Sequence, residues 1–194
     1  MALYFITGNE HKMSEVMEIL APQIKIYQMD IELAEVQSID PQEVIRHKLI
    51  EAAKYQQGEM IVEDTSLTLE ALNWKLPGPL IKFFVKALTT KGIFELAEKY
   101  KLFGAEAKTC IGYSNGREIL FFEGTVKGKL VKPKGVSGFG WDPIFVPEGQ
   151  NPKGQAKTFA EMGQKQKNEI SHRKKAVEKF KEYYLKKPAS PASK

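Results

Sequence analysis

Two charged side chains stand within helical stripes that are otherwise apolar. Lys48 follows Val44 by four residues and Ile45 by three, so it shares their face of the helix predicted there. Arg173 follows Ile170 by three residues and precedes Val177 by four, so it too lies on the apolar face of its predicted helix. A cation on such a face must either extend to solvent or meet an anion. The sequence leaves both alternatives open.

A third cation, Lys12, follows a turn that contains a glycine. Thr7, Gly8 and Asn9 separate the apolar run at 3–6 from the first residues of a predicted helix. A strand, a turn and a helix start together present backbone N–H groups to an anion. A lysine in the first helical turn opposes the helix dipole unless an anion lies nearby. The second glycine of a P-loop is missing, so a phosphate site and a plain capped turn both remain open.

Two acidic residues, Glu63 and Asp64, directly follow the apolar strand predicted at 60–62. In α/β sheets, ligands collect outside the carboxyl ends of the strands. A carboxylate at such a position can hold a metal ion or act as a general base. An aspartate that only forms a turn or caps a helix is the alternative.

The stretch SGFGWDPIF, residues 137–145, alternates glycines with aromatic rings. Gly140 separates Phe139 from Trp141, and Asp142 follows the second ring. Rings in a flexible loop suit stacking on a nucleobase, although a turn buried in the core explains them as well. Cations for phosphates, carboxylates for a metal and rings for a base are together what a nucleoside triphosphate with Mg²⁺ requires.

The elements that must position these residues alternate between strand and helix early in the chain. Apolar runs predict strands at 3–6, 24–26, 60–62, 108–114, 117–123, 126–131 and 144–146. Helical periodicity and capping signals predict helices at 13–20, 41–57, 80–88, 92–100 and 165–185. Asn115-Gly116 predicts a hairpin turn, and Thr158 to Glu161 has capping-box spacing. This order predicts an α/β fold with a mixed sheet and flanking helices.

Length and charge limit the class of protein. A chain of 194 residues suits one domain, predicted over residues 1–187, with a polar, proline-rich tail at 188–194 that we expect to be disordered. The net charge is +5, but residues 165–194 carry ten basic and three acidic residues, so residues 1–164 sum to −2. The basic excess therefore belongs to one predicted helix and its tail. It indicates a solvated helix face or an anionic ligand nearby.

The cellular setting follows from cysteine usage and hydropathy. The only cysteine, Cys110, cannot form an intrachain disulfide, which favours a reducing, cytoplasmic location. No apolar run approaches the roughly 18 residues that a membrane span needs. The first residues lack a basic segment and a cleavage pattern, so no signal peptide is predicted.

Taken together, the motifs resemble those of the inosine triphosphate pyrophosphatase family, whose members hydrolyse non-canonical purine nucleoside triphosphates. They occur in the order of the family and span nearly the whole predicted domain. The matching stretches are Thr7-Gly8-Asn9 with Lys12, Glu63 to Leu67, Leu76 to Pro79, Phe139 to Pro143, Thr158 to Met162, and Lys167 to Glu169 followed by Ser171-His172-Arg173.

The resemblance implies a two-lobed α/β fold with a mixed β-sheet, flanking helices and the nucleotide in a central cleft. It implies a homodimer, a requirement for Mg²⁺ with Mn²⁺ as an alternative, and a purine nucleoside triphosphate as substrate. The implied reaction is attack of water on the α-phosphorus of ITP, dITP or XTP, which gives a nucleoside monophosphate and pyrophosphate. Neither a membrane nor a stable nucleic-acid complex is expected.

The resemblance also implies roles for individual residues. Asp64 would be the catalytic residue that orients water, and Glu35 and Asp64 would hold the metal. The other implied residues would bind the substrate. Those on the triphosphate side are Thr7, Gly8, Asn9, Lys12, Lys48, Thr65 and Lys82, and those around the base are Phe139, Gly140, Trp141, Asp142, Lys167, His172 and Arg173.

Two stretches depart from the family, and two other functions remain. The polar stretch Gln150 to Lys157 is somewhat longer than in eukaryotic members. Leu72-Asn73-Trp74-Lys75 stands where the family commonly has a glycine-rich segment. A pyrophosphatase of modified pyrimidine nucleotides is the alternative enzyme. A nucleic-acid-binding module that uses the basic C-terminal helix is the alternative from another class, and it predicts steeply salt-dependent binding to oligonucleotides.

Overall fold

The computed structural model of the chain describes residues 2–135, 139–150 and 154–187. The tail predicted at 188–194, and Ser137 and Gly138 of the aromatic loop, lie outside these residues. The strands are β1 Leu3–Ile6, β2 Ile26–Met29, β3 Glu59–Leu69, β4 Pro77–Gly78, β5 Gly104–Ser114, β6 Ile119–Leu130 and β7 Phe145–Pro147. The helices are α1 Glu10–Leu20, α2 Pro41–Ala52, α3 Ile81–Tyr100, α4 Gln164–Ile170 and α5 His172–Lys186.

The strands of the described residues form one seven-stranded sheet in the order β2-β1-β3-β5-β6-β7, with β4 beside β3. The first three strands of this order run parallel, because a helix lies between each strand and the next along the chain. The remaining pairs are antiparallel. The predicted hairpin is confirmed, since β5 and β6 pair from Ser114 and Ile119 onward. The predicted α/β class with a mixed sheet is confirmed as well.

Strand β3 has an open edge in its middle. Strand β1 pairs with β3 only as far as Ile61, and β4 pairs with it only at Leu67 and Thr68. Strand β5, on the other side, pairs with β3 from Met60 to Leu69. Within the part of the chain that the structure describes, residues 62–66 therefore have a neighbouring strand on one side only. This segment contains the acidic residues that the sequence singled out.

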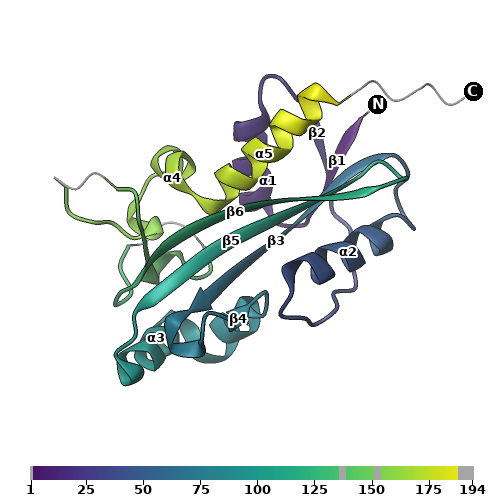
Figure 1. The fold of residues 1–194 in the computed structure, drawn as a ribbon. Coiled ribbons are helices and arrows are strands. Elements are labelled where there is room, and N and C mark those ends of the chain that lie inside the picture. Colours follow the sequence, from purple (N-terminus) through teal and green to yellow (C-terminus); the bar gives the residue numbers. More distant parts are fainter. Residues whose placement is uncertain (1, 136–138, 151–153, 188–194) are drawn as a thin grey trace, which may run out of the picture.

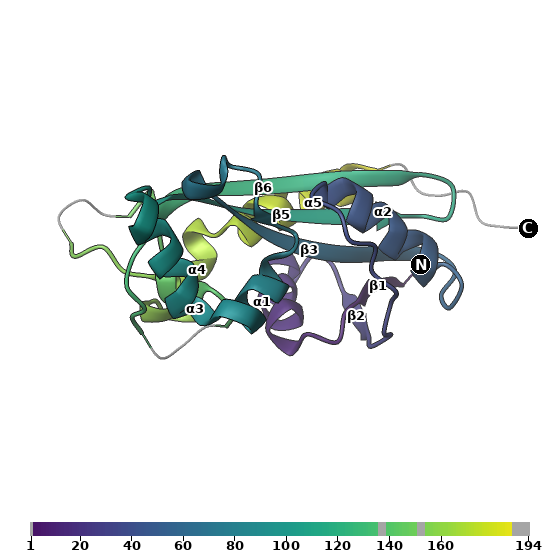
Figure 2. The same cartoon turned by 90° about the horizontal axis from the view of Figure 1, so that it is seen from below.

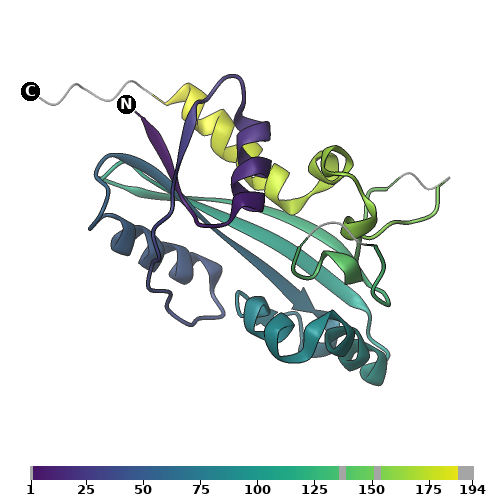
Figure 3. The ribbon, with the colours of Figure 1, turned by 180° about the vertical axis from the view of Figure 1, so that it is seen from behind.

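Helices cover both faces of the sheet, as Figures 1 and 2 show. Helices α1 and α5 pack side by side on one face, and α2 lies on the other, with α3 beyond it near β4. The same arrangement seen from behind places β1 and β2 at the end of the sheet next to α1 (Figure 3). Phe5, Leu20 and Phe180 belong to the core under α1 and α5, whereas Ile45 and Leu49 belong to the core under α2.

Several element boundaries differ from the prediction. The strand expected at 60–62 continues to Leu69, and the strands expected at 117–123 and 126–131 are the single strand β6. The helix expected at 41–57 ends at Ala52. The two helices expected at 80–88 and 92–100 form α3, which is kinked where Thr89 takes a positive φ of 61°.

The helix predicted at 165–185 is two helices, because the backbone at Ser171 is extended (ψ 154°). The Ser171 side chain accepts a hydrogen bond from the Lys174 backbone N–H (3.0 Å) and so caps the N-terminus of α5. The break turns α4 away from α5, and Lys167 projects from the shorter helix. The predicted capping box at Thr158 and Glu161 is confirmed on a short 3₁₀ helix. Within the residues that the structure describes, no helix is both long and apolar enough to cross a membrane.

Candidate functional site

A cavity of about 450 Å³ lies at the open edge of β3. The turn after β1, the loop after β2, helix α2, the start of α3 and the aromatic loop all contribute to its wall. Most of the residues singled out in the sequence line it, namely Thr7, Gly8, Asn9, Lys12, Glu35, Lys48, Asp64, Thr65, Lys82, Phe139, Gly140 and Trp141. Residues far apart in the sequence are therefore brought together as one site.

The turn after β1 is held by its own side chains. The Asn9 side chain accepts a hydrogen bond from the Lys12 backbone N–H (3.1 Å), so Asn9 caps helix α1. The Asn9 backbone N–H in turn donates to Thr7 Oγ1 (3.1 Å). At Gly8 a Cβ atom would overlap the carboxylate of Asp30. A larger residue at this position would therefore have to displace the Asp30 side chain.

Lys12 and Glu63 form an ion pair at the cavity wall. The distance from Lys12 Nζ to Glu63 Oε2 is 2.9 Å, and the Glu63 side chain is fully buried. Burial alone would raise the pKa of Glu63, but the positive charges of Arg173 and Lys12 outweigh it and hold that pKa well below its usual value. Glu63 is thus a fixed negative charge in the wall.

Lys48 reaches three oxygen atoms from its buried position on α2. Its Nζ lies 2.7 Å from Glu35 Oε1, 3.4 Å from Asp64 Oδ1 and 3.4 Å from the backbone carbonyl oxygen of Glu63. The side chain is 9% exposed, so the anomaly in the apolar stripe is explained by anionic partners rather than by extension to solvent. Burial lowers the pKa of Lys48, but the carboxylates of Asp64 and Glu35 more than offset this and raise it.

Asp64 differs from its neighbour Glu63 in protonation behaviour. Burial raises the pKa of Asp64 above its ordinary value, and the nearby Lys48 opposes this only in part. Its Oδ2 atom is buried and has no hydrogen-bond partner among the described residues. A buried carboxylate with a raised pKa and a free oxygen at a cavity wall suits a general base or a metal ligand.

The carboxylates around Lys48 fit a magnesium ion. Glu35 and Asp64 offer oxygen atoms, which this ion prefers as ligands. The Asp64 Oδ2 atom has no hydrogen-bond partner in the described part of the chain and is free to bind the metal. Among the described residues no group of three or more histidine, cysteine or acidic side chains is arranged for a metal. A site with two carboxylates is nevertheless typical of Mg²⁺, which keeps several waters and takes further oxygens from substrate phosphates.

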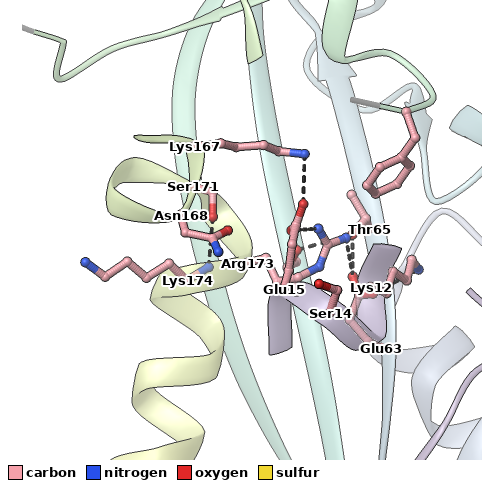
Figure 4. Close-up of polar contacts among 12 residues, drawn as sticks. Lys12, Ser14, Glu15, Glu63, Thr65, Lys167, Asn168, Ser171, Arg173 and Lys174 are labelled. Carbon is pink, nitrogen blue, oxygen red and sulfur yellow. Dashed lines mark hydrogen bonds and ion pairs between the residues drawn. The ribbon is translucent and has the colours of Figure 1, made fainter. Parts of the chain in front are cut away.

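Behind the cavity wall lies a cluster of buried charges centred on Arg173, whose side chain is 1% exposed (Figure 4). Its guanidinium donates to Glu15 through Nη1 and to Thr65 Oγ1 through Nη2 (3.1 Å), and Nη2 also lies 3.5 Å from Glu63 Oε1. Burial lowers the pKa of Arg173, but the charges of Glu63 and Glu15 raise it more. This second cation in an apolar stripe therefore also meets anions.

Lys167 connects this cluster to the aromatic loop. Its Nζ lies 3.1 Å from Glu15 Oε1 and 2.8 Å from Asp142 Oδ2. The same oxygen of Asp142 accepts a hydrogen bond from the backbone N–H of Phe139 (3.0 Å). Asp142 therefore links the aromatic loop to helix α4, and this link explains the acidic residue beside the two rings.

His172 is buried against two rings. Its ring centroid lies 5.4 Å from that of Trp141 and 5.8 Å from that of Phe159. Burial and the positive charges of Arg173 and Lys167 hold the pKa of His172 well below its ordinary value, so its imidazole is neutral. Its Nδ1 atom is buried without a hydrogen-bond partner among the described residues. Like Asp142, Lys167 and Arg173, it contacts the site from behind and does not line the cavity.

The family model for the Ham1 family matches residues 3–183. The chain belongs to the Ham1 family. The inosine triphosphate pyrophosphatase of Podospora anserina is 42% identical over 184 residues, which cover 94% of this chain and 93% of the relative. That of Pyricularia oryzae is 42% identical over 182 residues, which cover 93% and 92%. The resemblance stated from the motifs is thereby confirmed.

Solved structures of other Ham1 proteins share the fold. The Ham1 protein of Staphylococcus aureus superposes with a TM-score of 0.76 at 24% identity, covering 95% of this chain and 98% of its own. A HAM1 protein from Coxiella burnetii gives a TM-score of 0.75 at 24% identity, covering 96% and 100%. At these identities the likeness concerns the fold.

The sequence reasoning missed several residues of this Ham1-family site. Glu15 is buried on α1, whereas Met17, an apolar residue of the same helix, is 50% exposed. Glu63 is a structural partner of Lys12 and Arg173, whereas the sequence suggested only a metal ligand or a general base at the end of the strand. A longer strand would have placed Glu63 on the apolar face of Ile61 and Leu67, and that is a recognisable signal. Further apolar residues line the cavity without any such signal, namely Ile31, Leu33, Ile81, Phe83 and Val85.

Proposed function

We propose that the chain is a nucleoside triphosphate pyrophosphatase that hydrolyses ITP, dITP and XTP to the nucleoside monophosphate and pyrophosphate. The observation that carries the proposal is Lys48, held between Glu35 and Asp64 on the wall of a cavity large enough for a nucleotide. The names of the relatives support a purine substrate over the modified pyrimidine alternative.

The triphosphate would bind to the turn after β1 and to the cavity lysines. Thr7 and Asn9 with the start of α1 supply hydrogen-bond donors, and Lys12, Lys48 and Lys82 supply positive charge. Phosphoryl transfer depends mainly on positioning and charge neutralisation, which these groups provide. Lys12 would then be shared between a phosphate and its present partner Glu63.

Glu35 and Asp64 would hold Mg²⁺, for which Mn²⁺ could substitute. When bound, the metal neutralises phosphate charge and polarises the phosphorus–oxygen bonds. Asp64 would accept a proton from the attacking water, and its Oδ2 atom has no hydrogen-bond partner among the described residues. The water oxygen forms a bond to the α-phosphorus, the bond from that phosphorus to the bridging oxygen breaks, and pyrophosphate leaves. Thr65 would help to hold the site through its contact with Arg173.

The base would stack on Phe139, with Gly140 and Trp141 shaping the pocket. Lys167, His172 and Arg173 lie behind the cavity wall and would read its 6-oxo edge once the wall opens toward them, with Asp142 positioning Lys167. The short distance between the charged cluster and the aromatic loop supports this assignment, since Arg173 Cζ lies 5.6 Å from the centroid of the Phe139 ring. A 6-oxo group accepts hydrogen bonds, whereas the 6-amino group of adenine leaves the donors unpaired, and such mismatches discriminate strongly.

The test is an assay of the products with a matched pair of variants. Purified protein with Mg²⁺ should release pyrophosphate from ITP much faster than from ATP or GTP, and a chelator should stop the release. Asp64→Asn should abolish turnover without loss of folding, whereas Glu95→Gln, at an exposed ion pair on α3, should be fully active. Release of orthophosphate alone, or near-normal activity of Asp64→Asn, would contradict the proposal.

The remaining proposals concern the molecule as a whole. We propose one domain over residues 1–187 and a homodimer, on the family resemblance, and a cytoplasmic location, on the single buried cysteine Cys110. Light scattering tests the dimer directly, since a mass of 21.9 kDa would indicate a monomer.

A further inference from the structure

The Phe139 side chain is held by a contact that the motifs did not indicate. The ring of His11 stacks on the ring of Phe139, with centroids 5.2 Å apart and an interplanar angle of 12°. This separation lies within the range of favourable aromatic pairs. The backbone of Phe139 is fixed separately by its hydrogen bond to Asp142. The residue is therefore held at its backbone and at its ring.

Helix α1 places His11 for this contact. Asn9 caps the helix, so His11 projects from the first turn, beside Lys12. The imidazole is exposed and does not belong to the cavity wall, whereas Phe139 does. The imidazole thus covers one face of the Phe139 ring while the ring still borders the cavity.

Two cations also lie near the ring, but both form ion pairs with a residue outside the aromatic loop. Lys167 Nζ is 4.8 Å and Arg173 Cζ 5.6 Å from the ring centroid of Phe139. Both are ion-paired with Glu15 in the buried cluster, so their positions do not depend on the ring. Removing the His11 imidazole therefore releases the ring without disturbing those charges.

We propose that His11 is a positioning residue for the purine base, which completes a stack of imidazole, Phe139 ring and base. The inference rests on the proposed function, in which Phe139 is the platform for the base. A ring that is already held in one orientation loses less conformational freedom when the base binds. His11 therefore acts on base affinity through Phe139, and it touches neither the phosphates nor the metal ligands.

The kinetic test compares pyrophosphate release from ITP by the wild type, His11→Ala, His11→Phe and the control His47→Ala. His47 is an exposed histidine on α2 without an aromatic contact among the described residues. We expect KM to rise about threefold to tenfold in His11→Ala, as the cost of ordering one more side chain on binding predicts, while kcat stays nearly constant. His11→Phe restores a ring and should restore KM. Inhibition by added pyrophosphate, which has no base, should be the same in all four proteins.

An NMR measurement tests the stack independently of turnover. The imidazole C–H resonances of His11 should be shifted upfield by the Phe139 ring, and Phe139→Leu should abolish the shift. Absence of the shift in the wild type overturns the inference. An unchanged KM in His11→Ala also overturns it. So does a pyrophosphate inhibition that weakens as much as KM for ITP rises, because the variant would then have lost an interaction with phosphate and not with the base. A wild type that releases no pyrophosphate from ITP refutes the proposed function itself, and the inference with it.

Discussion

Substitution of Arg173 by methionine should destabilise the folded protein strongly. The Arg173 side chain is 1% exposed and pairs with Glu15 and Glu63, which are buried as well. Removing one partner of a buried ion pair typically costs about 3–5 kcal/mol, because the remaining charge is left uncompensated. Each carboxylate here keeps one other cation, since Lys167 lies 3.1 Å from Glu15 and Lys12 lies 2.9 Å from Glu63. The loss should therefore fall near the lower end of that range, at about 3 kcal/mol.

Urea unfolding at pH 7 measures this loss, with the free energy of unfolding extrapolated to water. The double variant Glu15→Gln/Arg173→Met should lose less than the sum of the two single variants, because the two side chains interact directly. Lys186→Met is the control, since Lys186 pairs with Glu182 on the exposed surface of α5 and should make no measurable difference. A loss below about 1 kcal/mol in Arg173→Met would refute the view that the buried cluster depends on this guanidinium.

Three further predictions follow from other contacts. Because the pKa values of Glu15 and Glu63 are depressed in the folded protein, their stabilisation is present above the ordinary glutamate pKa of 4.5, and the urea midpoint should fall as the pH drops below it. Gly8→Ala should raise KM for ITP, since the added Cβ would displace the Asp30 carboxylate or the turn beside it. Glu59→Gln should cost about 1–3 kcal/mol of unfolding free energy, because the carboxylate accepts hydrogen bonds from two tyrosine hydroxyls. Glu59 does not line the cavity, so that variant should leave KM for ITP unchanged.

The sequence identified buried cations but not their partners. Lys48 and Arg173 break apolar stripes, and a local pattern suffices to say that each must be compensated. The partners come from positions that local patterns do not connect: Glu15 lies 158 residues from Arg173 and Glu63 lies 110 residues from it. Periodicity along one helix contains no information about which strand or helix will pack against it. Such pairs become visible only when the topology is known.

The element boundaries failed for a related reason. The strand predicted at 60–62 was expected to end at Val62 because polar residues follow the apolar run, yet backbone pairing of β3 with β5 continues to Leu69. The break at Ser171 was missed because Ile170, just before it, keeps helical spacing with Val177 after it. In both cases tertiary pairing or a side-chain cap overrode the local pattern.

The open edge of β3 explains how adjacent acids acquire different properties. Side chains alternate along a strand, so Glu63 and Thr65 point to the face covered by α1 and α5, while Asp64 points to the face covered by α2. In the interior of a sheet the strand itself would separate them, but where one edge of β3 has no neighbouring strand all three border the same cavity. The charges of Arg173 and Lys12 keep Glu63 ionised, whereas burial raises the pKa of Asp64 more than Lys48 lowers it. One carboxylate is thereby fixed as a structural charge, and its neighbour is left free to exchange a proton.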